Sequence, residues 1–354
     1  MNLPRITILA TLLLTAPAAA QLQITPPATT PSPPAEKQKA KPPAPAKKKE
    51  AAPAPKPSAS PKPALPATVI PAPPTDNSNV DLVYGAYQRG QYKTAFELAT
   101  ARAQAGDPKA MTMLGELYSN AMGIRRDYAK ALEWYKRAAD AGDREAMFAL
   151  AMLRISGRGG PVDKGEAVKL MASAAKLGEP KAAYNLALLY LDGQTLPQDV
   201  KRSAELLRQA ADAGLPEAQY ALATFYKEGT GVPKDPERAV RLLQAASLTD
   251  NVDAEVEYAI ALFNGTGTPK NQPAAVALLR KASRQGSAIA QNRLAWVLIN
   301  GMGTSVDKVE GFKWHLVAKT AGKGDPELDK QLSDLPAEDR AKAEAAARKW
   351  LGTK

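Results

Sequence analysis

The stretch AQYALATFYKEGTGVPKD, from Ala218 to Asp235, places two glycines shortly before a lysine. Glycines beside a lysine can form a phosphate-binding loop, which reads G-x-x-x-x-G-K-[ST] and occurs once in a domain. Here the lysine follows the second glycine by three residues and has no Ser or Thr behind it. Related stretches, GTGTPKN at 265–271 and NGMGTSVDK at 300–308, follow at successive displacements of 36 residues. A fixed period indicates a repeat architecture rather than a nucleotide site.

The repeat is clearest at an alanine that recurs every 36 residues. The series comprises Ala110, Ala146, Ala182, Ala218, Ala254 and Ala290. Four residues after each alanine stands Leu or Tyr, five after it a small residue, and eight after it mostly Tyr or Leu. These positions share one stripe of an α-helix, so the pattern predicts an amphipathic first helix in every unit.

A second helix follows in each unit after a glycine-containing turn. We expect the first helix to end at glycines with left-handed backbone, namely Gly157, Gly193, Gly229, Gly265 and Gly301. The second glycine of G-x-G then turns the chain, at Gly123, Gly159, Gly231, Gly267 and Gly303, with Thr195 in the remaining unit. Good N-cap residues come next, at Asp127, Asp163, Asp199, Asp235, Asn271 and Asp307. The G-x-G motif is therefore interpreted as the hinge of a helical hairpin.

The unit A-x-x-x-L-[GA]-x-x-Y-x-x-G-x-G resembles the Sel1-like repeat family, and its clearest copy is KAMTMLGELYSNAMGIRRDYAKALEWYKRAADAGDRE. The resemblance covers roughly residues 80–327. It implies an all-α fold, a right-handed superhelical solenoid of α/α pairs related to tetratricopeptide repeats. It also implies an adaptor that holds proteins or peptides, often in secreted or periplasmic regulation. Some members carry a disulfide in each repeat and are linked to β-lactam binding, but this chain has no cysteine.

Residues 1–20 have the pattern of a secretory signal peptide. Arg5 supplies a positive start, residues 6–14 are apolar, and small residues precede a cleavage site near Ala20. The apolar run is too short to span a bilayer comfortably, so we expect no transmembrane anchor. The expected location is the periplasm, or the medium after secretion.

Residues 21–79 are predicted to form a disordered linker rich in Pro, Ala and Lys. This segment holds 17 of the 30 prolines, and its eight lysines against Glu36, Glu50 and Asp76 give a net charge of +5. Such a composition buries too little apolar surface to offset the entropy of ordering. The linker is either a spacer or a segment in weak contact with an anionic cell envelope.

The remaining chain divides into three predicted parts. Residues 80–109 form a shortened tetratricopeptide-like repeat, and residues 110–327 form six 36-residue units. Residues 328–354 are expected to be capping helices, including a charged helix after Pro336. Atypical terminal units are what a solenoid needs, because its ends have no neighbouring repeat to cover them.

Nothing in the sequence predicts a catalytic residue, a cofactor site or a metal site. Without cysteine there is no thiolate, and His315 is the single histidine, so we interpret it as a helix packing residue. The pattern S-x-x-K occurs at Ser173 and Ser305, but the S-D-N and K-T-G motifs of β-lactamases are missing. The export signal and the modest charge of the repeats also argue against a nucleic-acid partner.

The predicted function is a protein-binding or peptide-binding scaffold, with or without a regulatory role, that acts through the concave face of the solenoid. Apolar residues beyond the packing stripe line that expected face, and they are the predicted partner-binding residues Phe148, Met152, Tyr184, Leu188, Tyr220, Ile260, Phe263 and Trp296. The same side chains could instead pack between neighbouring first helices. Two other functions stay open: a cell-wall-directed enzyme or β-lactam-binding protein, and an envelope-associated structural protein acting through its basic tail.

Overall fold

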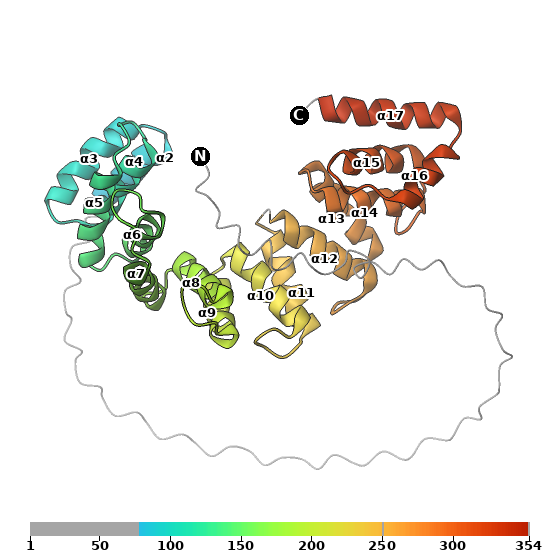
Figure 1. Cartoon of the computed structure of the whole chain (residues 1–354). Coiled ribbons are helices and arrows are strands. Elements are labelled where there is room, and N and C mark those ends of the chain that lie inside the picture. Colours follow the sequence, from blue (N-terminus) through green and yellow to red (C-terminus); the bar gives the residue numbers. More distant parts are fainter. Residues whose placement is uncertain (1–77, 250, 353–354) are drawn as a thin grey trace, which may run out of the picture. The chain divides into compact units, whose positions relative to one another are not determined.

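A computed structural model describes residues 78–249 and 251–352, and within these ranges all regular structure is α-helical (Figure 1). The signal peptide and almost all of the linker predicted from the sequence lie outside the described residues. The helices are α2 (Ser78–Gln88), α3 (Tyr92–Gln104), α4 (Pro108–Asn120), α5 (Tyr128–Asp140), α6 (Arg144–Ser156), α7 (Lys164–Lys176), α8 (Pro180–Asp192), α9 (Val200–Asp212), α10 (Pro216–Glu228), α11 (Pro236–Ser247), α12 (Val252–Asn264), α13 (Gln272–Arg284), α14 (Ala288–Ile299), α15 (Lys308–Thr320), α16 (Pro326–Ser333) and α17 (Ala337–Gly352).

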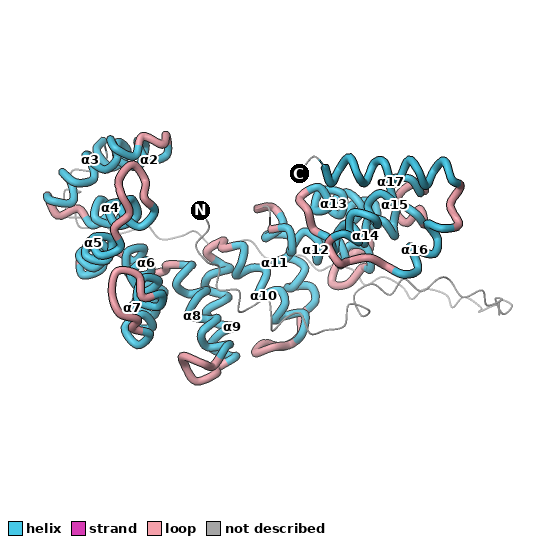
Figure 2. The backbone as a smooth tube through the Cα atoms, turned by 45° about the horizontal axis from the view of Figure 1, so that its top comes forward, coloured by secondary structure: helices cyan, strands magenta, loops and turns pink. Residues whose placement is uncertain are grey.

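Helices α4 to α15 form six hairpins, each made of a first helix and a second helix (Figure 2). The two helices of a hairpin pack against each other, and each second helix packs against the first helix of the next hairpin. Contacts therefore run mainly between neighbours along the chain, which is the organisation of a solenoid. The predicted all-α repeat fold is confirmed.

The second helices begin at the predicted caps. In α5, the carboxylate of Asp127 accepts a hydrogen bond from the backbone N–H of Lys130, and Asp163, Asp199, Asp235, Asn271 and Asp307 cap α7, α9, α11, α13 and α15 in the same way. Each cap satisfies a backbone donor that the first helical turn leaves free. Most first helices are capped as well, by Asp107, Asp143, Glu179, Asn251 and Ser287, whereas Leu215 at the start of α10 has no side-chain acceptor.

The first helices end largely as expected. Gly157, Gly193, Gly229 and Gly265 are the left-handed residues that follow α6, α8, α10 and α12. Two units differ: Ala121 takes the left-handed conformation after α4, with φ of 58°, and α14 ends at Ile299 and is followed by Asn300, one residue before the left-handed Gly301. A left-handed alanine is strained because its Cβ crowds the backbone.

The second glycine of G-x-G has a role that the hinge interpretation missed. Gly231 has φ of +66°, and a Cβ placed on it would lie 2.6 Å from the carbonyl oxygen of Val200, the first residue of α9. Gly159 and Gly267 approach the backbone at the start of α5 and α11 in the same manner. In the units that carry it, the second glycine therefore allows the hairpin turn to touch the preceding repeat.

The core consists mainly of small and aliphatic side chains, together with buried aromatic residues such as Phe312 and Trp314. All six alanines of the series that begins at Ala110 are buried. One cluster of buried residues extends from α6 into α12, and a second extends from α12 to α17. The small side chains let neighbouring helices approach closely and pack tightly. The apolar contacts lie mainly between helices that are adjacent in the chain.

Helix α17 covers the last hairpin. Its Ala343 and Ala347 are buried, and the ring of Trp350 meets that of Trp314 edge-on at 5.1 Å between centroids. Helix α16 begins after Asp325, whose carboxylate accepts hydrogen bonds from the N–H groups of Glu327 and Leu328. Within the described ranges, no helix is both long and apolar enough to cross a membrane.

Candidate protein-binding surface

The eight predicted partner-binding residues lie on five successive first helices, α6, α8, α10, α12 and α14. Leu188 and Phe263 are buried, and the other six are half-buried. The half-buried side chains pack against the two main core clusters. These residues therefore contribute to packing between repeats, and their part in binding a partner stays a prediction.

Three aromatic residues occupy the same position in consecutive repeats. Phe148, Tyr184 and Tyr220 each stand two residues after the repeat alanine, on α6, α8 and α10, and each is half-buried. Burial raises the pKa of the Tyr220 phenol well above its usual range, and the nearby carboxylates of Glu257 and Asp253 add to the effect. The phenol is therefore neutral across the physiological pH range, as suits an aromatic contact surface.

Polar contacts join successive first helices beside these apolar residues. The hydroxyl of Thr112 on α4 donates a hydrogen bond to the N-cap carboxylate of Asp143 at 3.1 Å. Lys227 on α10 pairs with Glu257 on α12, with 3.0 Å between Nζ and Oε2. Such contacts set the spacing of the first helices and place charge beside the apolar positions.

Trp296, the last of the eight predicted partner-binding residues along the chain, has a hydrogen-bond partner that the sequence analysis missed. Its Nε1 donates a hydrogen bond to the carboxylate of Asp325 at 3.0 Å, which ties α14 to the start of α16. The amide of Asn292 on α14 also donates to the carbonyl of Lys323 at 3.2 Å. Trp296 therefore anchors the C-terminal cap, whatever else it contacts.

The residues considered for chemistry do not converge on one another. Ser173 and Ser305 are exposed, one late in α7 and the other in the turn before α15. His315 is buried in α15, and its Nε2 lies 2.8 Å from the carboxylate of Asp329 on α16. This contact agrees with the predicted packing role of His315. Within the described ranges, no group of three or more acidic or histidine side chains could hold a metal ion.

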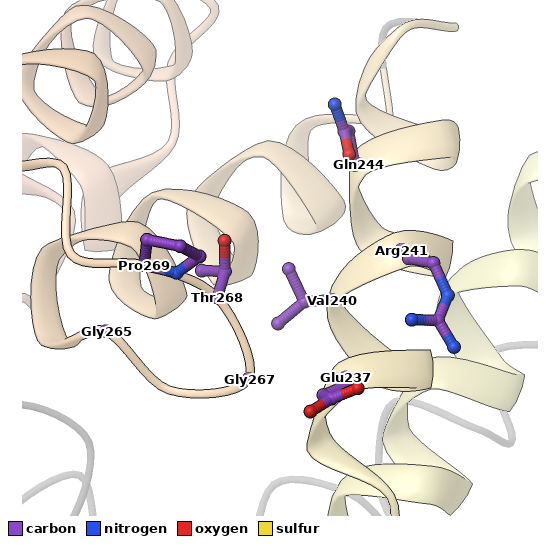
Figure 3. A pocket seen from close by; sticks show the side chains of 8 residues that line it. All are labelled: Glu237, Val240, Arg241, Gln244, Gly265, Gly267, Thr268 and Pro269. Atoms are coloured by element: carbon purple, nitrogen blue, oxygen red, sulfur yellow. The ribbon is translucent and has the colours of Figure 1, made fainter. Parts of the chain in front are cut away.

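Two open hollows lie on α9 to α11 and on the turn after α12. The first, of about 530 Å³, is lined by Glu237, Val240, Arg241 and Gln244 of α11 and by Gly265, Gly267, Thr268 and Pro269 of the next hairpin turn (Figure 3). The second, of about 350 Å³, is lined by Arg208, Asp212, Leu222, Tyr226, Arg238, Arg241 and Leu242. Sequence reasoning did not single out these arginines, because the repeat pattern concerns only the buried positions.

Comparisons with known proteins agree with the repeat architecture. The Sel1 repeat matches residues 108–143, 144–179, 180–215, 216–248, 252–287 and 288–323. A comparison with curated proteins finds no match.

Solved structures of Sel1 repeat proteins are among those similar to this chain. One is a protective antigen of uropathogenic Escherichia coli strains with a Sel1-like repeat fold, at 26% identity and a TM-score of 0.66, covering 77% of this chain and 60% of that one. Another is a Sel1 repeat protein from Oxalobacter formigenes, at 24% identity and a TM-score of 0.57, covering 68% of this chain and 96% of that one. Sel1 repeats typically mediate interactions between proteins and are typically not catalytic. With six matched repeats that span more than half of its residues, the chain belongs to the Sel1 repeat family.

Proposed function

We propose that this protein is an exported scaffold that binds a protein or peptide along its first helices, α6 to α14. The observation that carries the proposal is the row formed by Phe148, Tyr184 and Tyr220, which repeat at one position and keep part of each ring accessible. Aromatic rings supply large contact area at low cost in side-chain entropy, and they dominate the energetics of many interfaces. The interaction role typical of Sel1 repeats supports the same function.

Export is part of the proposal and rests on residues 1–20, which have the pattern of a signal peptide. The Pro- and Lys-rich segment that follows would then separate the repeats from the mature N-terminus. Its net charge of +5 suits either a spacer or weak contact with an anionic envelope. Mass spectrometry of the protein recovered from the periplasm should give a mature N-terminus close to Gln21.

The binding surface can be tested by site-specific photo-crosslinking in cells. A benzophenone side chain at Tyr184 should capture a defined partner, whereas the same group at exposed Leu177, after α7, should not. In the purified complex, Tyr184→Ala should weaken binding by more than about tenfold, because a lost aromatic anchor costs roughly 2 kcal/mol. Helical content should stay unchanged.

Two results would contradict the proposal. Equal capture of the partner from Leu177 and Tyr184 would place the interface elsewhere. Unfolding of Tyr184→Ala would show that the ring belongs to the core. The proposal would then require that Phe148→Ala stays folded and loses partner binding.

A further inference from the structure

Two guanidinium groups from different repeats converge on the hydroxyl of Tyr226, near the end of α10. Nη2 of Arg208 on α9 donates to this oxygen at 3.2 Å, and Nη1 of Arg238 on α11 lies 3.4 Å from it. Burial opposes ionisation of the phenol, yet the two guanidiniums outweigh this effect and hold the pKa of Tyr226 below its usual value. Two positively charged groups therefore meet at this one hydroxyl.

A third arginine faces the same hollow. Arg241 lines the hollow together with Arg208, Arg238 and Tyr226. In Figure 3 its side chain extends away from the turn that carries Thr268 and Pro269, whereas Val240 points toward that turn. Arg241 therefore lines both hollows, and its guanidinium extends away from the hairpin turn that lines the first.

Few carboxylates neutralise these charges. Nε of Arg238 pairs with Asp235 at 3.1 Å, and Asp212 also lines the hollow. Across residues 78–249 and 251–352, Arg208 and Arg241 have no ion pair within 4.0 Å. Both side chains are exposed, so a soluble ligand can reach them.

Comparison of the six repeats shows that this charge pattern is specific to one of them. The residues equivalent to Arg238 and Arg241 in the successive units are Lys130 and Glu133, Glu166 and Lys169, Arg202 and Glu205, Arg238 and Arg241, Ala274 and Ala277, and Glu310 and Lys313. Two of the opposite-charge pairs form salt bridges, at 3.7 Å for Glu166 and Lys169 and at 2.7 Å for Arg202 and Glu205. The fourth unit instead places two like charges at i and i+3, where the positive side chains of Arg238 and Arg241 repel each other.

We propose that the hollow formed by Arg208, Tyr226, Arg238 and Arg241 binds a phosphoryl group. Guanidinium forks match the geometry of phosphate oxygens, and three of them suit a dianion better than a singly charged carboxylate. The oxygen of Tyr226 accepts N–H groups from the arginines, so its own O–H is free to donate to the ligand. This function is separate from the binding of a protein partner.

Isothermal titration of the whole chain with inorganic phosphate, at constant ionic strength in chloride, tests the site. Arg208→Gln and Arg241→Gln should each weaken phosphate binding by about tenfold or more, because each removes charge-assisted hydrogen bonds. The matched control is Arg202→Gln, which removes an exposed arginine from α9 at the position equivalent to Arg238 and should leave the affinity within about twofold. Tyr226→Phe should weaken binding while the three arginines remain.

Vesicle-binding measurements identify the source of the phosphoryl group. Phosphatidylcholine vesicles with and without phosphatidic acid distinguish a lipid headgroup from free phosphate, and loss of either interaction in Arg241→Gln supports the site. An equal loss of phosphate or phosphatidic acid binding in Arg202→Gln would show that binding depends only on general surface charge. That result would overturn the proposal. Equal binding of acetate, or no binding of phosphate and phosphatidic acid, would overturn it as well.

Discussion

Gly231 illustrates how one residue can satisfy two independent constraints. Its φ of +66° lies in the left-handed region, and a Cβ added to it would collide with the carbonyl of Val200 in the preceding repeat. The first constraint is local to the turn, while the second concerns contact between repeats. Gly214, after α9, has φ of +84° but no neighbouring atom within 4 Å of an added Cβ. Substitutions at Gly214 and Gly231 can therefore distinguish the cost of backbone strain from the cost of a steric clash.

We expect Gly214→Ala to lower the free energy of unfolding by about 1–2 kcal/mol, the usual cost of a left-handed non-glycine residue. Gly231→Ala should cost clearly more, because its methyl group would also collide with the backbone of Val200. Gly231→Val should be worse still, since a β-branched residue resists positive φ. Urea unfolding followed by circular dichroism measures all three, and equal losses for the two alanine variants would contradict a close contact between repeats.

At the scale of the elements, a salt bridge between the second helices α13 and α15 supplements the apolar core. Arg280 on α13 donates two hydrogen bonds from Nη1 to the carboxylate of Glu310 on α15, both at 2.8 Å. Nε1 of Trp314 adds a third at 3.2 Å. Burial alone would raise the pKa of Glu310, but Arg280 and Trp314 together hold it below its ordinary value. The ionised carboxylate is thus part of the packing between α13 and α15.

This contact makes stability depend on pH in a defined direction. Because the pKa of Glu310 is lower in the folded state, its contribution is complete above the ordinary glutamate pKa of 4.5 and is lost as the pH falls through the folded value. Between pH 7 and pH 3 we expect the melting temperature of Glu310→Gln to fall less than that of the unchanged protein. Identical pH profiles would show that the ionised carboxylate adds nothing to stability.

At the scale of the whole molecule, a repeat array needs closed ends. Each repeat contacts only its neighbours, so the last hairpin would expose apolar surface if nothing covered it. Helix α17 provides the cover with Ala343, Ala347 and Trp350, while the opposite face of the same helix carries exposed charges such as Glu338 and Lys342. The structure thus supports a capping role for this helix.

Ending the chain after Leu335 should therefore destabilise the C-terminal repeats. We expect a loss of at least about 2 kcal/mol, because Trp314 would lose Trp350 and the side of α15 under α17 would be exposed. Increased fluorescence of a hydrophobic dye would report the exposed surface. As a control, replacing Glu338 and Lys342 by Ala removes an exposed salt bridge and should change stability by less than about 1 kcal/mol. Unchanged melting of the truncated chain would show that α17 is not a cap.

The sequence by itself determined the helical hairpins, their caps and their 36-residue period. These features depend on interactions within a few residues: Asp127 caps the helix that begins beside it, and Gly229 ends the helix directly before it. A periodic stripe of alanine and leucine then identifies the buried face without knowledge of the neighbouring helix.

Only the tertiary structure decided which residues meet across repeats. Val200 lies 31 positions before Gly231, Asp325 lies 29 positions after Trp296, and Arg208 lies 18 positions before Tyr226. Such contacts depend on how one hairpin is rotated and shifted against the next, and on the rotamers that its side chains adopt. Burial at the predicted surface is set in the same way, which is why Leu188 is buried while Tyr184, four residues earlier on the same helix, is only half-buried.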